Sequence, residues 1–260
     1  MGIINVTPDS FSDGGRFLAA DAALAHARRL IAEGADILDI GGESTRPGAT
    51  AVPEAEELAR VLPLIVAIRA ESAVPISIDT VKPEVAHAAV LAGATMWNDV
   101  SALGHAADAP AMAAELGCEV VLMHRLGEPG TMQDDPRYED VVAEVEAFLL
   151  ARVEVALAAG VAREKLWLDP GIGFGKTPEH NLALLRALPR FVALGFPVLL
   201  GASRKRFIAA IDPAATDAAD RLGGSLAVAL HGARAGVAAV RVHDVRETVQ
   251  ALTVSAALLA

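Results

Sequence analysis

Polar side chains that could bind a ligand or take part in catalysis stand at the ends of eight short apolar runs in this sequence. In chain order they are Asn5; Asp39, followed by Glu43, Ser44, Thr45 and Arg46; Asp79; Asn98 and Asp99; His124; Asp169; Ser203, Arg204 and Lys205; and Arg241 and His243. In a barrel of parallel strands, the carboxyl ends of the strands meet on one face, where the active site is built. The pattern therefore predicts one shared site.

These side chains fall into three chemical groups. The cationic or potentially cationic residues, which suit a phosphate or pyrophosphate, are Arg46, Lys205, Arg241 and His243. The acceptors and the amide expected deep in a barrel are Asp79, Asn98 and Asp169, and such an array suits a flat heterocycle with several N–H groups. Asn5 offers a neutral oxygen, which could join a Mg²⁺ ion held mainly by ligand phosphates.

Each of these residues also has a structural interpretation when it is taken alone. Asp79 and Asp169 could cap the helices that follow them, and His124 could be a hydrogen-bonded core histidine. A polar group at the end of all eight apolar runs together favours the functional interpretation.

The elements that must position these residues alternate along the chain. Apolar runs typical of buried parallel strands cover 2–6, 35–42, 74–80, 95–100, 118–124, 165–171, 196–203 and 237–244. Segments with helical spacing cover 22–34, 53–70, 83–93, 109–117, 139–160, 179–189, 221–236 and 244–258. Strand followed by helix, eight times, predicts an α/β fold, a (β/α)8 TIM barrel that forms a single domain over residues 1–260.

A doubly wound open sheet is the competing architecture. Its first turn usually carries a glycine-rich dinucleotide motif, whereas the first turn here is NVTPDSFSDGG. The two long connections at 5–21 and 41–54 are typical of loops that close over a site.

Composition excludes several other classes of protein. The net charge of −11 argues against a nucleic-acid surface, and no apolar run is long enough to span a membrane. With no targeting signal at the start, we expect a soluble, cytoplasmic protein. The single cysteine, Cys118, stands in an apolar run and is expected to be buried. Pro170 occupies the position where a phosphate-binding GxxxxGK loop needs glycine, and no zinc-ligand spacing is present.

Motifs at all eight strands together carry a family resemblance, from residue 1 to about residue 250. In order they are MGIINVTPDSFSDGG, DIGGESTRPGA, SIDT, WNDV, LMH, DPGIGFGK, GASRK and RVHDV. The set resembles the bacterial dihydropteroate synthase family of pterin-binding enzymes. That resemblance implies a transferase of folate biosynthesis, which joins 6-hydroxymethyl-7,8-dihydropterin pyrophosphate to 4-aminobenzoate and releases 7,8-dihydropteroate and pyrophosphate.

The resemblance also implies a role for each matching residue. Pterin would be held by Asp79, Asn98, Asp169 and Lys205, with Met123 lining the same slot and Arg241 packed on the ring. Pyrophosphate would meet Asn5 with Mg²⁺, Arg46, Arg241, His243 and Asp13. The 4-aminobenzoate pocket, where sulfonamides would compete, would be formed by Phe11, Thr45, Pro47, Phe174, Ser203 and Lys205. The catalytic set would be Asp79, Asp169, Lys205, Arg241 and His243.

An SN1-like course agrees with these residue types. A cation on the pterin methylene needs carboxylates beside the ring and positive charge on the leaving group, whereas an arylamine nucleophile needs only positioning. The resemblance further implies a homodimer formed through the late helices. Family members usually begin with a short hairpin before the first strand, and here the first strand begins almost at Met1.

Two alternatives remain at this stage. One is a pterin-binding barrel of the kind that serves methyl-folate chemistry, which should lack the 4-aminobenzoate loops and the SRK and RVHD anion site. The other is a catalytically silent relative that only binds.

Overall fold

The computed structural model describes residues 1–6, 15–44, 51–127 and 131–259, with the side chains of 15–20 left out. The strands are β1 (Gly2–Asn5), β2 (Leu38–Gly41), β3 (Ile76–Asp79), β4 (Met96–Asp99), β5 (Glu119–Met123), β6 (Leu166–Asp169), β7 (Leu199–Leu200) and β8 (Ala239–Val240). The helices are α1 (Gly15–Ala32), α2 (Glu54–Glu71), α3 (Pro83–Leu91), α4 (Ala109–Leu116), α5 (Val141–Ala158), α6 (Pro178–Arg186), α7 (Leu188–Val192), α8 (Arg206–Ile211), α9 (Leu222–Ala235) and α10 (Val245–Leu259), with 3₁₀ turns η2 (Arg163–Lys165) and η3 (Ala219–Arg221).

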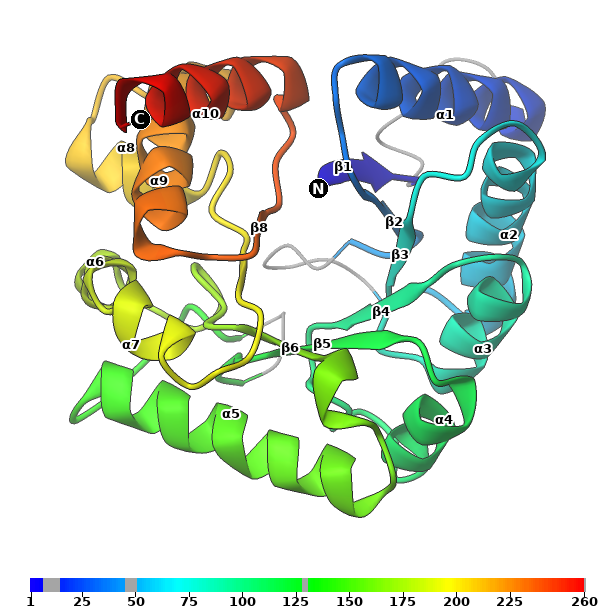
Figure 1. Cartoon of the computed structure of the whole chain (residues 1–260), viewed down its shortest axis with the longest axis horizontal. Helices are drawn as coiled ribbons and strands as arrows, with labels where there is room; N and C mark the ends of the chain where they lie inside the picture. Colours follow the sequence, from blue (N-terminus) through cyan, green and yellow to red (C-terminus); the bar gives the residue numbers. More distant parts are fainter. Residues whose placement is uncertain (7–14, 45–50, 128–130, 260) are drawn as a thin grey trace.

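The strands close into a ring. β1 to β6 pair in parallel in chain order, and β7 pairs in parallel with β8. A bridge between Leu168 and Val198 joins β6 to the start of β7, and a bridge between Gly2 and Val242 joins β1 to the end of β8. Each strand therefore has two neighbours, and the helices lie around the outside (Figure 1). The predicted barrel is confirmed, and the open doubly wound sheet is excluded.

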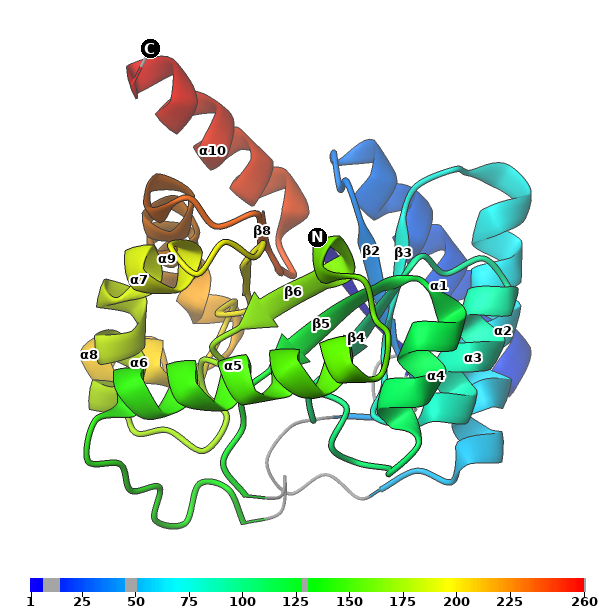
Figure 2. The ribbon, with the colours of Figure 1, turned by 60° about the horizontal axis from the view of Figure 1, so that its bottom comes forward.

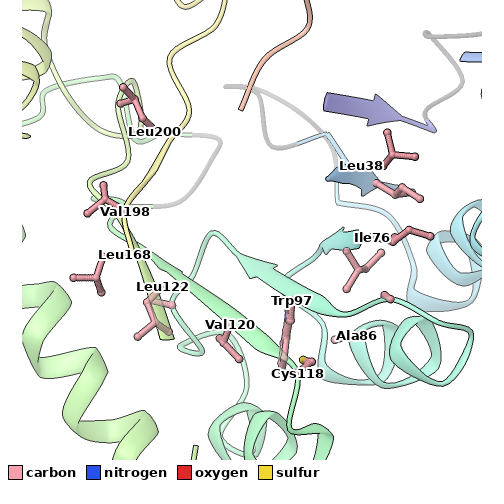
Figure 3. Packing of buried hydrophobic residues seen from close by; sticks show 14 of the residues in the cluster. Leu38, Ile76, Ala86, Trp97, Cys118, Val120, Leu122, Leu168, Val198 and Leu200 are labelled. Carbon is pink, nitrogen blue, oxygen red and sulfur yellow. The ribbon is translucent and has the colours of Figure 1, made fainter. Parts of the chain in front are cut away.

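Alternation along the strands produces two apolar layers. Side chains that point outward, such as Leu38, Trp97 and Leu168, pack under the helices in the larger core cluster (Figure 3). Met96, Val121 and Leu199 form a separate interior cluster, next to Met1. Trp167 and Ala239 pack against the same cluster. Because side chains alternate across a strand, the residues two positions beyond Met96, Trp167 and Ala239 also point inward, and these are Asn98, Asp169 and Arg241.

Cys118 is one of the outward-packed residues. It is 7% exposed and belongs to the larger core cluster, and burial raises the pKa of its thiol to about 11. The expectation of a buried, unreactive cysteine is confirmed.

Two features of the helices differ from the sequence prediction. α1 begins at Gly15, so the long first connection is shorter than expected because the alanine-rich residues before 22 are already helical. Between β7 and β8, α8 and η3 precede the expected helix α9. No helix of the described residues has the length and apolarity needed to cross a membrane.

Candidate active site

The ends of β1 to β4 lie in one row of the pairing register, and Met123 and Asp169 lie two residues further along β5 and β6 than that row. In the pairing register Asn5 stands opposite Gly41, Gly41 opposite Asp79, and Asp79 opposite Asn98. Further around the barrel, Met123 of β5 stands opposite Asp169 of β6. The register therefore brings together the side chains that the sequence predicts for a deep heterocycle pocket.

Arg241, which follows β8, bridges two carboxylates, one on β2 and one on β3. Its Nε donates to Asp39 Oδ2 at 2.5 Å, and one of its terminal nitrogens donates to Asp79 Oδ2 at 2.7 Å. Asn98 Nδ2 lies 3.4 Å from both oxygens of Asp39. Burial disfavours the charge on Arg241, but Asp39 and Asp79 outweigh burial and raise the pKa of the guanidinium. Arg241 is therefore a fixed cation at the centre of the site.

Asp39 is a polar strand residue to which the sequence prediction assigned no role. It is fully buried and occupies an inward-facing position, two residues before Gly41. The available signal was a charged residue within an otherwise apolar strand. It stands an even number of positions before Gly41 and Glu43, so it points to the same face of the strand as they do. Its structural role is to hold Arg241 in place.

Asp79 keeps one oxygen available. The side chain is 6% exposed, and within the described part of the chain its Oδ1 has no hydrogen-bond partner. Burial raises the pKa of Asp79 to about 7, although Arg241 opposes this and Asp39 adds to it. A buried acceptor without a donor is costly, so this oxygen is suited to an N–H group of a ligand.

Asp169 and Lys205 are two further charged groups at the face of the barrel, and each affects the pKa of the other. Asp169 Oδ1 accepts from the backbone N–H of Gly171 at 2.7 Å, and burial raises the pKa of its carboxyl while Lys205 opposes the rise. Burial lowers the pKa of Lys205 to about 8, and Asp169 opposes the fall. Lys205 Nζ donates to the carbonyl of Ile172 and lies 4.4 Å from the centre of the Phe174 ring.

His243, Ser203 and Asn5 form a third group. Ser203 Oγ lies 3.0 Å from His243 Nδ1 and accepts from the His243 backbone N–H at 3.3 Å. Asn5 and His243 line one cavity of about 620 Å³, together with His26 and Arg29 of α1. Several donors and two further cationic or basic side chains thus face the same space, which is suited to an anion.

The turn between Ser203 and Lys205 has an unusual backbone. Arg204 has φ of 59°, in the left-handed region that non-glycine residues rarely adopt. Its guanidinium pairs with Asp244, with Nε 3.0 Å from Oδ2, and its backbone N–H donates to Ser225 Oγ at 2.9 Å. These contacts fix a turn that places Ser203 and Lys205 on the same face of the barrel.

Several strand-end residues have structural roles instead. Asp99 accepts from the backbone of Ser101 and Leu103 and so closes its own turn. His124 is 5% exposed, burial lowers its pKa to about 3, and its ring meets the edge of Phe148 at 4.9 Å. The core interpretation of His124 is therefore confirmed.

The capping interpretation of the two aspartates is wrong. The residue that caps α3 is Lys82, and the one that caps α6 is Thr177, so neither Asp79 nor Asp169 caps the next helix. Both carboxylates belong to the polar face of the barrel.

Five predicted site residues lie outside the described residues: Phe11, Asp13, Thr45, Arg46 and Pro47. The other ten are all at the described face. Among the described residues no cluster of three or more His, Cys, Asp or Glu side chains could hold a metal ion.

Comparisons with known proteins agree with this geometry. The family model described as "Pterin binding enzyme" matches residues 1–243. The dihydropteroate synthase of Escherichia coli K12 is 48% identical over 259 residues, which cover 100% of this chain and 91% of that relative. The solved structure of the Xanthomonas albilineans dihydropteroate synthase with 4-aminobenzoic acid is 53% identical, covers 100% of this chain and 92% of its own, and superposes with a TM-score of 0.94.

A second structure of the Xanthomonas albilineans enzyme, in complex with 7,8-dihydropteroate, is 49% identical, covers 100% of this chain and 93% of its own, and has a TM-score of 0.90. Both the family model and these identities extend over nearly the whole barrel. The chain therefore belongs to the pterin-binding enzyme family, among its dihydropteroate synthases.

Proposed function

We propose that this site transfers a pterinylmethyl group from dihydropterin-CH₂-pyrophosphate to 4-aminobenzoate, which gives dihydropteroate and pyrophosphate. The observation that carries the proposal is the buried array in which Arg241 bridges Asp39 and Asp79 at the same level as Asn98. A solved relative at 53% identity is a dihydropteroate synthase with 4-aminobenzoic acid, and another at 49% is in complex with 7,8-dihydropteroate.

The deep array supplies the groups that a pterin ring requires. Asp79 presents an acceptor oxygen that has no partner among the described residues, Asn98 stands on the neighbouring strand, and Asp169 stands on β6. The planar guanidinium of Arg241 is held on both sides, so it can pack on a flat ring without reorienting. Met123, which is 3% exposed, gives the slot an apolar wall.

An SN1-like course fits the distribution of charge. When the bond between the methylene carbon and the pyrophosphate oxygen breaks, the electron-rich ring holds positive charge, which the carboxylates of Asp79 and Asp169 stabilise. The arylamine nitrogen then forms the new C–N bond and gives up one proton, which the departing pyrophosphate can accept. No strong general base is required, because an arylamine is nucleophilic as a neutral molecule.

The anion side of the site would use Arg241 and the cavity that His243 lines together with Asn5. The Asn5 side chain makes no hydrogen bond to any described residue, so its oxygen is available. A Mg²⁺ ion fits this donor set, since Mg²⁺ is often held by one or two protein oxygens plus substrate phosphates and needs no carboxylate cluster. When bound, the ion would neutralise charge on the leaving pyrophosphate. His243 and Arg241 would bind the same pyrophosphate.

The 4-aminobenzoate side would be built on Phe174, Lys205 and Ser203. Lys205 is charged at neutral pH and lies against Phe174, so the pair offers both a cation for the carboxylate and a ring face for the arene. The predicted contributions of Phe11, Thr45 and Pro47 stay predictions. A sulfonamide, which resembles the arylamine, would compete for this position.

One experiment tests the function directly. Purified protein is mixed with dihydropterin pyrophosphate, Mg²⁺ and 4-aminobenzoate, and dihydropteroate is measured by mass spectrometry. We expect product only with both substrates, loss of product on chelation with EDTA, and its return with added Mg²⁺. The variants Asp169→Ala and Lys205→Ala should lose product while keeping a cooperative thermal transition. Full activity in both variants, or pterin binding without product, would contradict the proposal.

We also propose a homodimer, formed through the late helices. The last part of α10 reaches away from the rest of the molecule (Figure 2), and Val254, Leu258 and Leu259 there are 53%, 80% and 70% exposed. Exposed leucines grouped at one helix end are typical of an interface. A cytoplasmic location stays a prediction.

A further inference from the structure

Lys176 is a buried cation to which the proposed reaction assigns no role. It follows the turn after β6, is 3% exposed, and its Nζ has three partners. The ammonium lies 2.9 Å from His124 Nδ1, and it donates to the carbonyls of Phe174 at 3.0 Å and His124 at 3.3 Å. An ammonium has three N–H groups, so these contacts use all of them. They require a neutral His124 with Nδ1 as the acceptor, in agreement with its lowered pKa.

The partners of Lys176 belong to two strand ends. His124 follows β5, and Phe174 is part of the turn 171–175 that follows β6. In this turn Gly171 and Gly175 have φ of 68° and 63°, and a Cβ on Gly171 would overlap the carbonyl oxygen of His124. The turn therefore packs tightly against the end of β5, with Lys176 underneath it.

The same turn carries the contacts of Lys205. The carbonyl of Ile172 accepts from Lys205 Nζ, and the Phe174 ring lies 4.4 Å from that nitrogen. Lys176 and Lys205 thus both contact this turn, Lys176 at the carbonyl of Phe174 and Lys205 at the carbonyl of Ile172.

We propose that Lys176 is a positioning residue for the 4-aminobenzoate side of the site, which fixes the turn 171–175 and thereby places Phe174 and the Ile172 carbonyl against Lys205. The inference rests on the proposed contact of Phe174 and Lys205 with 4-aminobenzoate. A charged donor is suited to this role because an apolar side chain would leave the two carbonyls and the imidazole nitrogen without partners.

Electrostatics gives Lys176 a second effect on the site. Burial lowers the pKa of Lys176 to about 7, and Asp169 opposes the fall. In return, Lys176, after Lys205 and the Gly171 N–H, is among the groups that oppose the burial-driven rise in the pKa of Asp169, and Arg241 acts in the same direction. Removing the charge of Lys176 should therefore raise the pKa of Asp169 and favour its protonated form.

The test is the variant Lys176→Met. It keeps a long unbranched side chain but removes the positive charge and the N–H donors of Lys176. We expect the KM for 4-aminobenzoate to rise about tenfold, while the KM for the pterin pyrophosphate changes by less than about threefold, because a small displacement of a binding group weakens mainly the ligand it touches. At pH values below the pKa of Asp79, activity should fall more steeply than in the parent protein, because Asp169 protonates more readily. Partial unfolding would instead lower kcat and leave both KM values unchanged.

Two further variants support the interpretation. Lys165→Met, at the opposite end of β6 in η2, is the matched control and should keep both KM values and the pH profile. Tyr138→Phe removes the hydrogen bond from Tyr138 Oη to the carbonyl of Gly175, which is 2.8 Å long, and should raise the same KM by a smaller factor. This milder change decides the question if Lys176→Met does not fold.

Clear outcomes would overturn the inference. A folded Lys176→Met protein with unchanged KM values and pH profile would do so, and so would an unfolded Lys176→Met combined with an unchanged KM in Tyr138→Phe. Phe174→Ala tests the underlying assignment separately. If that variant keeps the KM for 4-aminobenzoate, the role of Phe174 in substrate binding is wrong, whatever Lys176 does.

Discussion

Asp39 illustrates how one buried side chain can set the charge of its neighbours. It is fully buried, accepts from Arg241 at 2.5 Å, and lies close enough to Asp79 to add to the rise in its pKa. Asp39 therefore affects the proposed pterin pocket in two ways. It holds the guanidinium of Arg241 in place, and its negative charge raises the pKa of the nearby Asp79.

We predict that Asp39→Asn moves the acid limb of kcat/KM for the pterin pyrophosphate to lower pH. The ionised form of Asp79 is the one that stabilises a cationic ring, so activity should rise with pH through the pKa of Asp79, which is about 7. The substitution removes a negative neighbour and leaves Arg241 to pair with Asp79 alone. Both changes favour the ionised carboxylate and lower its pKa.

The measurement is a pH profile of the variant beside that of the parent protein, so that titration of the substrate pyrophosphate affects both equally. Asp36→Asn, an exposed position just before β2, serves as the control and should leave the limb in place. A limb that stays put or moves upward in Asp39→Asn would show that Asp79 does not set it.

At this scale the sequence predicted the polar strand ends but not their supports. Asp79, Asn98, Asp169 and Arg241 were found because each stands where an apolar run stops. Asp39 was assigned no role, and Lys176 was not singled out, because their importance depends on partners distant in the sequence. The ring brings Asp39 to Arg241 and Lys176 to His124, and no local pattern records either distance.

Helix α2 is joined to the site end of the barrel by a buried ionic cluster. Lys82, at the start of α3, pairs with Glu57 of α2 and with Glu43, which follows β2. Glu57 is fully buried, and its Oε1 has no partner among the described residues. The cluster thus links the end of β2, helix α2 and the start of α3 next to the second strand-to-helix loop.

We predict that Lys82→Met lowers the free energy of unfolding by about 3 kcal/mol, because it leaves the buried Glu57 carboxylate without its cation. Urea denaturation measures the loss. Adding Glu57→Leu should recover most of it, since an apolar pair can replace a buried ion pair. Arg28→Ala, which removes an exposed pair with Glu71, should change stability far less. Equal losses in Lys82→Met and Arg28→Ala would contradict the prediction.

The prediction of elements worked best where burial is strongest. The eight strands lie within the predicted apolar runs. Both faces of these strands are covered, so their residues are almost all apolar and the strands are easy to recognise in the sequence. The start of α1 and the presence of α8 were missed, because segments rich in alanine or mixed in polarity lack a clear period. Tertiary contacts at the face of the barrel decide such segments.

At the scale of the whole molecule, the end of α10 predicts association. Leu258→Glu combined with Leu259→Glu should convert a sedimenting mass of two chains to one, because charge on a desolvated apolar interface is costly. Sedimentation velocity at micromolar concentration measures it. The exposed substitution Glu247→Gln, at the other end of the helix, is the control. A parent protein that sediments as a single chain would end the dimer proposal.

The closure of the ring also determines when the pocket can form during synthesis of the chain. Arg241 stands 202 positions after Asp39. A ribosome that builds the chain from its amino end therefore releases Asp39 and Asp79 long before the cation that neutralises them exists. During that interval two carboxylates point into one unfinished interior and repel each other. The pocket is completed only when the last strand is inserted, so a nascent chain that stops before residue 241 has part of a barrel wall and no active site.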